Sequence, residues 1–188
     1  DIYAYRGLSK SKTGEDATED LNKAASQGTQ EYEVYRLLGD IYFKSKEYQQ
    51  AISIYNKGIA LKADDHIIIN NRGKAKMELQ DYSGAVADFN SSLSIQPDYS
   101  RALLNRGITK FRLEDYQGAL SDLEKAHQSV RENREINKML GLSYYKTGNK
   151  VQAKSYLIKA IASNVKVGDV FLCSGLIAYD EGDFKNAA

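Results

Sequence analysis

The chain repeats itself at intervals of 34 residues. Residues 71–89 (NRGKAKMELQDYSGAVADF) and residues 105–123 (NRGITKFRLEDYQGALSDL) are identical at ten of nineteen positions. A marker glycine recurs on one phase, at Gly39, Gly73, Gly107, Gly141 and Gly175. An alanine recurs on another, at Ala17, Ala51, Ala85, Ala119, Ala153 and Ala187. A period of this length indicates an array of small structural units, each of which buries its apolar face against its neighbours.

Inside each repeat, the apolar residues have helical spacing. Residues 34–43 place Tyr35, Leu38 and Tyr42 on a single face, and residues 51–62 have a similar stripe. Polar turn segments separate the two halves of each repeat, and the whole chain contains one proline. The pattern predicts an all-α fold of antiparallel helix pairs. Small residues at the glycine and alanine phases would let paired helices approach closely, with Tyr, Phe or Leu filling the gap.

This 34-residue unit resembles the tetratricopeptide repeat. Its glycine falls at the eighth position, its alanine at the twentieth, an aromatic residue or Leu at the twenty-fourth and a small residue at the twenty-seventh. Residues 79–98 (LQDYSGAVADFNSSLSIQPD) match the family's pattern closely, including Pro97, whereas Asn137 departs from the large residue usual at the fourth position. The resemblance covers essentially the whole chain and implies a right-handed α-solenoid, a superhelix of helix pairs.

We expect a single array over residues 1–188. Its repeats are expected at 1–31 (repeat 1), 32–65 (repeat 2), 66–99 (repeat 3), 100–133 (repeat 4), 134–167 (repeat 5) and 168–188 (repeat 6, incomplete). Repeat 1 is expected to lack two residues between its turn at Gly14 and Ala17. We also expect the natural chain to begin before Asp1 and to continue past Ala188. The uncovered face of residues 168–188 makes self-association through that repeat an alternative.

Composition excludes several functional classes. A formal net charge of +1 gives no electrostatic case for nucleic acid, and no apolar run is long enough to predict membrane insertion. The single cysteine, Cys173, allows no internal disulfide and is compatible with a reducing compartment such as the cytoplasm. No basic-then-apolar leader is visible. His66 and His127 have no neighbours at metal-ligand spacing, and the glycines follow the repeat, not a phosphate loop. We therefore predict no metal, no cofactor and no enzymatic activity.

The resemblance implies a binding function. In the tetratricopeptide family, the first helix of each repeat lines a concave groove that binds an extended peptide or a partner helix. We predict a non-catalytic protein–protein interaction scaffold for a protein or peptide partner of unknown identity. The alternative is a regulatory or substrate-docking segment of a larger enzyme or signalling protein, and sequence beyond the two ends would discriminate between them.

The candidate peptide-binding residues are those that the resemblance places on the groove side of the first helices. They are Arg36, Asp40, Phe43, Asn70, Asn71, Lys74, Met77, Arg101, Asn105, Ile108, Phe111, Lys138 and Tyr145. The twelfth position of successive repeats carries an aromatic residue or Met, namely Phe43, Met77, Phe111, Tyr145 and Tyr179. This line is either an apolar track for a ligand or a set of contacts between repeats, and we favour the second interpretation.

Three of the candidates resemble part of the carboxylate clamp of chaperone-binding family members. Arg36, Asn71 and Arg101 supply donors that suit a C-terminal carboxylate. Asp40 stands where a neutral Asn is usual and would repel such a ligand, and Asn105 stands where an Arg is expected. We therefore favour a mixed polar groove that binds a peptide over a true clamp.

The arginine of the NRG motif occurs at Arg6, Arg72 and Arg106, the seventh position of its repeat. This position partly faces the helix pair. We expect the arginine stem to be buried and its guanidinium to reach an acid, with Asp88 and Asp122 as candidate partners.

Overall fold

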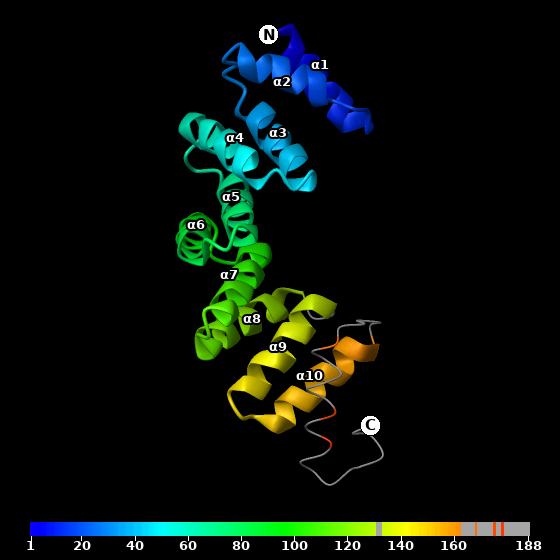
Figure 1. Cartoon of the computed structure of the whole chain (residues 1–188), viewed down its shortest axis with the longest axis vertical. Helices are drawn as coiled ribbons and strands as arrows, with labels where there is room; N and C mark the ends of the chain where they lie inside the picture. The colour runs from blue at the N-terminus through cyan, green and yellow to red at the C-terminus, as the bar shows by residue number, and fades with distance from the viewer. Residues whose placement is uncertain (131–132, 163–167, 169–174, 176–177, 179–188) are drawn as a thin grey trace. The chain divides into compact units, whose positions relative to one another are not determined.

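A computed structural model describes residues 1–130, 133–162, 168, 175 and 178 (Figure 1). These residues form ten α-helices and no strand: α1 (Ile2–Thr13), α2 (Thr18–Ser26), α3 (Tyr32–Lys44), α4 (Tyr48–Leu61), α5 (His66–Glu78), α6 (Tyr82–Ile95), α7 (Ser100–Arg112), α8 (Tyr116–Ser129), α9 (Arg134–Lys146) and α10 (Lys150–Ala162). The predicted all-α fold is confirmed. Predictions about Cys173, Tyr179, Ala187 and most of repeat 6 lie outside the described residues.

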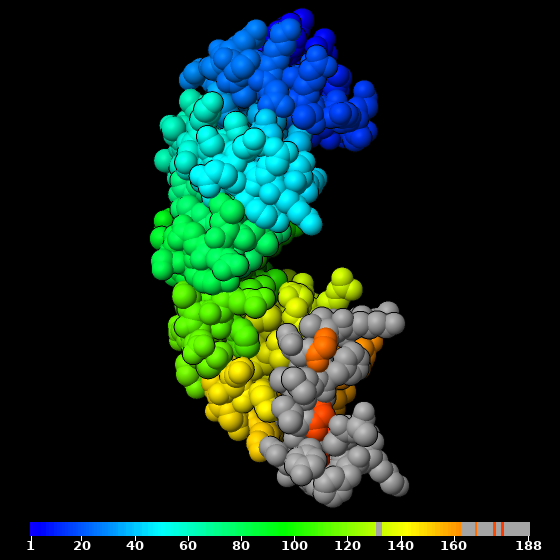
Figure 2. Space-filling view, in the orientation of Figure 1, coloured from blue at the N-terminus to red at the C-terminus, as the bar shows by residue number. Residues whose placement is uncertain are grey.

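The helices divide into two compact units, residues 1–97 (the N-terminal unit) and 98–188 (the C-terminal unit). In the N-terminal unit α1 packs on α2, α3 on α4 and α5 on α6, and the pairs adjoin through α2–α3 and α4–α5. In the C-terminal unit α7 packs on α8 and α9 on α10, joined through α8–α9. On the face drawn in Figure 2, the atoms of the N-terminal unit, coloured blue to green, form a continuous packed surface.

Each helix pair closes on a contact between the marker glycine and one large side chain. A Cβ added to Gly39 would lie 2.3 Å from Cε1 of Tyr55, and one added to Gly73 would lie 2.8 Å from Cε1 of Phe89. The remaining pairs have the same contact with a leucine: Gly7 with Leu21, Gly107 with Leu123, and Gly141 with Leu157. These partner side chains are all essentially buried. The glycine therefore lets the paired helices approach closely, and an added side chain would force the facing residue to move.

The turn inside each pair depends on a residue in the left-handed backbone region, seven positions after the marker glycine. These residues are Gly14 (φ 80°), Lys46, Gln80 and Glu114 (φ 63° each) and Gly148 (φ 83°). A side chain in this conformation costs about 1 kcal/mol or more. The turn compensates with hydrogen bonds, such as Glu47 N to the Tyr42 carbonyl oxygen at 2.9 Å, which closes α3. Asp81 and Asp115 then cap the following helices by accepting from Gly84 N and Gly118 N.

Repeat 1 departs from this scheme at the start of its second helix. α2 begins four residues after Gly14, whereas α4 begins two residues after Lys46. α2 has nine residues, against 14 in α4. Ala17 lies just before the helix but stays buried, and Leu21 still packs against Gly7. Ala17 follows Gly14 by three residues, whereas Ala51 follows Lys46 by five, so α2 lacks a first helical turn while Ala17 and Leu21 keep their buried positions.

Candidate functional site

The NRG arginines form ion clusters around a buried aspartate that hold the two helices of a repeat together, although Arg6 itself is exposed, contrary to the expected burial of its stem. Arg72 donates from Nε and Nη2 to the two carboxylate oxygens of Asp88, at 2.9 and 2.6 Å. Lys76, one helical turn after Arg72, places its Nζ 2.9 Å from Asp88 Oδ2. Asp88 is buried, so the two cations replace the water that its carboxylate loses.

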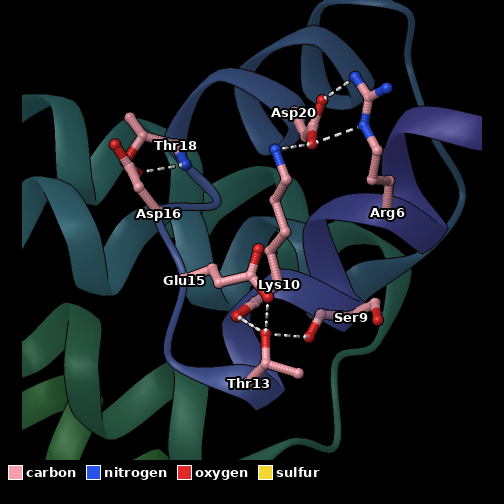
Figure 3. A network of polar contacts seen from close by, with 8 residues as sticks. All are labelled: Arg6, Ser9, Lys10, Thr13, Glu15, Asp16, Thr18 and Asp20. Atoms are coloured by element: carbon pink, nitrogen blue, oxygen red, sulfur yellow. Dashed lines mark hydrogen bonds and ion pairs between the residues drawn. The ribbon is translucent and has the colours of Figure 1, made fainter.

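The same three-residue cluster occurs in two other repeats. Arg106 and Lys110 contact Asp122 in repeat 4, with Arg106 Nε 2.8 Å and Lys110 Nζ 2.8 Å from Oδ2. In repeat 1, Arg6 and Lys10 of α1 converge on Asp20 of α2 (Figure 3). The hydrogen bonds from Arg6 and Lys10 hold the pKa of Asp20 well below its usual range.

The predicted pairing of Arg72 with Asp88 and of Arg106 with Asp122 is confirmed. The lysines and Asp20 were not predicted, although each lysine follows its arginine by four residues, the spacing that puts two residues on one helix face. These charged residues are committed to helix packing within a repeat.

Repeats 2 and 5 replace the ion cluster with apolar and aromatic residues. Leu38, Tyr42 and Ile54 occupy the three positions in repeat 2, and Leu140, Tyr144 and Tyr156 occupy them in repeat 5. The rings of Tyr144 and Tyr156 are stacked, with centroids 5.7 Å apart and an interplanar angle of 10°.

In both of these repeats, the first tyrosine donates a hydrogen bond to the preceding repeat. Tyr42 Oη donates to Asn22 Oδ1 at 2.8 Å, and Tyr144 Oη donates to Glu124 Oε1. The same three positions of a repeat thus hold either an ion cluster or a set of residues whose tyrosine links two repeats.

Among the candidate groove residues of the N-terminal unit, Asp40 is the central acceptor. Its Oδ1 accepts from Tyr55 Oη at 2.7 Å and from Asn71 Nδ2 at 2.9 Å, so it joins α3, α4 and α5. Arg36 Nη1 lies 3.7 Å from Asp40 Oδ2. Asn70 Nδ2 donates to Asn71 Oδ1 at 3.1 Å. The structure therefore brings together four of the predicted residues, Arg36, Asp40, Asn70 and Asn71.

This arrangement weighs against a carboxylate clamp at these residues. Arg36 also donates to Glu33 Oε1 at 2.7 Å, so two acids of its own helix flank its guanidinium. The Asp40 carboxylate already accepts from Asn71 and lies beside Arg36, where a ligand carboxylate would have to bind. Arg101, the third clamp candidate, belongs to the C-terminal unit, where its side chain is exposed.

Sequence reasoning missed the role of Tyr55. Its phase identified it as a core residue, and it is 1% exposed. The sequence did contain an indication of this role. Other repeats have Phe89 or Leu at this position, and a tyrosine there brings a buried hydroxyl that needs a hydrogen-bond partner. Burial, followed by the Asp40 charge, raises the pKa of Tyr55, which keeps its hydroxyl protonated as a donor.

Twelfth-position aromatic residues pack on their own repeat. The Phe43 ring lies 5.3 Å from the Tyr48 ring, and the Phe111 ring lies 5.2 Å from the Tyr116 ring. Both remain partly exposed. Lys74 Nζ lies 4.6 Å from the centroid of Phe43, a cation–π contact between α5 and α3. These ring contacts lie within one repeat, whereas the favoured interpretation expected contacts between repeats. Met77 is also partly exposed.

The remaining candidates lie on α7 and α9 of the C-terminal unit. Asn105 and Ile108 are partly exposed on α7. On α9, Lys138 pairs with Glu135 at 2.6 Å and Tyr145 is partly exposed.

The described part of the chain also bears on metal-ligand groups and on membrane-spanning helices. No group of three or more His, Cys, Asp or Glu residues there is arranged to hold a metal ion. Within the same ranges, no helix has the length and apolarity needed to cross a membrane. His66 is the first residue of α5, and His127 packs edge-on against Tyr156 at 5.6 Å.

Comparison with protein-family models identifies the class. Models described as tetratricopeptide repeats match residues 32–65, 70–133 and 139–164. The chain belongs to the tetratricopeptide repeat family, whose members are typically non-catalytic scaffolds for protein interaction. No curated protein sequence matches the chain.

Solved structures share the fold at low identity. PilF of Pseudomonas aeruginosa is 20% identical with a TM-score of 0.83, covering 99% of this chain and 86% of its own. MamA (41-end) of Desulfovibrio magneticus RS-1 is 20% identical with a TM-score of 0.75, covering 83% and 88%. YrrB, described as a TPR protein with an unusual peptide-binding site, is 17% identical with a TM-score of 0.74, covering 89% and 86%. These likenesses support the helical solenoid.

Proposed function

We propose that this protein-interaction scaffold binds an extended peptide segment of a partner protein through its first helices. The observation that carries the proposal is the hydrogen-bonded chain from Asn70 through Asn71 to Asp40. It fixes the Asn71 amide in one orientation on a partly exposed surface, so binding would cost little side-chain entropy. An oriented amide suits the backbone of an extended peptide, which presents both donors and acceptors.

The charges around the hydrogen-bonded residues Asn71 and Asp40 favour an acidic residue in the peptide. Glu33 and Asp40 already flank Arg36, whereas Lys74 is held over the Phe43 ring. An acidic side chain would gain a charge-assisted hydrogen bond from Lys74, while apolar peptide side chains would contact Phe43 and Met77.

Selection from a displayed library of random linear peptides tests the proposal. We expect enriched peptides to combine an acidic residue with apolar ones. Lys74→Glu should weaken them about tenfold or more, because it replaces a charge-assisted contact with repulsion. The control is Lys57→Glu, the same reversal at an exposed position of α4, the second helix of its repeat. Selected peptides that bind Lys74→Glu and Asn71→Ala as tightly as the unchanged protein would contradict the proposal. Arg101→Glu reports whether the C-terminal unit takes part.

A further inference from the structure

A polar pocket of about 440 Å³ lies in the C-terminal unit, and none of the candidate groove residues lines it. Its walls come from one face of α8, from the end of α9 and from the turn before α10. The polar lining residues are Gln117, Ser121, Glu124, Tyr144, Thr147 and Asn149. Its volume is in the range of pockets that hold a side chain or a small ligand.

The wall of the pocket differs from the corresponding surface of repeats 3 and 4. Thr147 occupies the position where repeats 3 and 4 have Leu79 and Leu113, side chains that are 45% and 47% exposed. Replacing the longer leucine with threonine opens space at this position. Tyr144 occupies the position of Lys76 and Lys110, which in repeats 3 and 4 form ion pairs with buried aspartates.

The acidic residue of the pocket also differs from the residue at the equivalent position of the preceding repeats. Glu124 stands where the preceding repeats have Asn22, Asn56 and Asn90. In the N-terminal unit, Asn22 accepts from Tyr42 and Asn56 accepts from Arg72. A neutral acceptor is thus sufficient for the link between repeats, and the charge of Glu124 is additional to it.

The hydroxyl protons of Tyr144 and Thr147 are already donated to protein oxygens, so the two hydroxyl oxygens can act only as acceptors for a ligand. Tyr144 donates its proton to Glu124, and burial, followed by that hydrogen bond, raises the pKa of Tyr144 so that the proton is kept. Thr147 donates to the carbonyl oxygens of Ser143 and Tyr144, each at 3.1 Å. The stack on Tyr156 fixes the Tyr144 ring. The site therefore offers a carboxylate and oriented acceptors, which suits a cationic donor.

We propose that this pocket binds the cationic side chain, Lys or Arg, of a partner protein. The ammonium or guanidinium group contacts Glu124, and the oxygens of Tyr144 and Thr147 orient it by accepting its hydrogen bonds. Leu120, which also lines the pocket, gives the methylene stem an apolar surface. Because Glu124 comes from α8 and Tyr144 from α9, the ligand contacts two successive repeats, and this second site is independent of the peptide-binding surface proposed above.

The test is an NMR titration of the ¹⁵N-labelled full chain with blocked tripeptides Ac-Gly-Arg-Gly-NH₂ and Ac-Gly-Lys-Gly-NH₂. We expect saturable shifts of amides around residues 117–124 and 144–149. The neutral Ac-Gly-Gln-Gly-NH₂ should cause none. Spermidine forms a separate arm, since a free polyamine carries the same chemistry. Shifts of these amides by spermidine alone would overturn the assignment to a protein side chain.

Two variants isolate the pocket. Glu124→Gln removes the charge but keeps an acceptor for Tyr144, and it should weaken the Arg tripeptide about tenfold or more, the factor expected for one charge-assisted hydrogen bond. Thr147→Leu restores the residue of repeats 3 and 4 and should block binding by filling the space. Glu47→Gln, the same change at an exposed acid outside the pocket, should bind like the unchanged protein. Unaltered binding by Glu124→Gln and Thr147→Leu, with native thermal unfolding, would overturn the proposal.

Discussion

Gly39 of α3 lies directly against the ring of Tyr55 of α4, and an added Cβ would meet three ring atoms at 2.3, 2.5 and 2.9 Å. The ring cannot swing aside freely, because its hydroxyl donates to Asp40 at 2.7 Å. In repeat 4 the partner of Gly107 is Leu123, whose nearest atom would lie 2.8 Å away and whose side chain can change rotamer. The same sequence motif therefore tolerates a methyl group differently in the two repeats.

We predict that Gly39→Ala destabilises the fold by about 2–3 kcal/mol, the range of an overpacked core with no room to relax. Gly107→Ala should cost about 1 kcal/mol or less, because leucine adjusts and alanine has the better helix propensity. Urea unfolding of both variants measures the difference. Equal losses would show that the anchored tyrosine ring does not set the cost.

The ion clusters predict an unusual order of stabilities. Asp88→Asn leaves Arg72 and Lys76 without their buried charge partner, and we expect a loss of about 2–3 kcal/mol, since both cations are partly exposed. Asp64→Asn, at an exposed position of the same unit, should change stability by less than about 0.5 kcal/mol.

Replacing the whole cluster should be milder than breaking it. The triple variant Arg72→Leu, Lys76→Tyr, Asp88→Ile gives repeat 3 the three residue types that repeat 2 has at these positions. We expect its stability to stay within about 1 kcal/mol of the unchanged protein, because no buried charge is left unpaired. The introduced tyrosine has Asn56 as an acceptor, as Tyr42 has Asn22. A triple variant less stable than Asp88→Asn would contradict this expectation.

The low pKa of Asp20 predicts a pH dependence of stability. Arg6 and Lys10 favour its ionised form in the folded state, so folding lowers this pKa below the value of about 4 in the unfolded chain. The stabilisation is complete above the unfolded pKa and decreases as the pH falls towards the folded one. We expect the stability difference between the unchanged protein and Asp20→Asn to be constant from pH 7 to 5 and to shrink between pH 4 and 2. A difference that does not change over that range in urea unfolding would refute the coupling.

The fold was predictable because the period places residues by size. Gly39, Ala51 and Tyr55 fall on fixed phases, and each phase corresponds to one contact between paired helices. Arg72 and Asp88 were predictable as partners for the same reason. The Asp40 cluster was not, because its members come from three helices of two repeats, and the period does not specify which polar atoms meet across a repeat boundary.

Asp40 also determines how the candidate surface treats a peptide's C-terminus. Its carboxylate lies beside Arg36 and accepts from Asn71, so a second carboxylate there would be repelled. Asp40→Asn removes the charge while its amide oxygen still accepts from Tyr55 and Asn71. We predict that this variant gains about fivefold in preference for a peptide with a C-terminal carboxylate over its amide, the effect of about 1 kcal/mol from one unit charge at close range in water.

Titration with Ac-Ala-Leu-Ala-Leu, as the carboxylate and as the amide, measures this preference by NMR. Asp64→Asn again serves as the charge-matched control and should leave the preference unchanged. If Asp40→Asn and the unchanged protein show the same ratio of affinities for the carboxylate and the amide peptide, Asp40 does not control access of a carboxylate to Arg36 and Asn71. Because Glu33 still pairs with Arg36 in the variant, Glu33→Gln combined with Asp40→Asn should increase the preference further. An increase in the double variant alone would identify Glu33 as the acid that controls the surface.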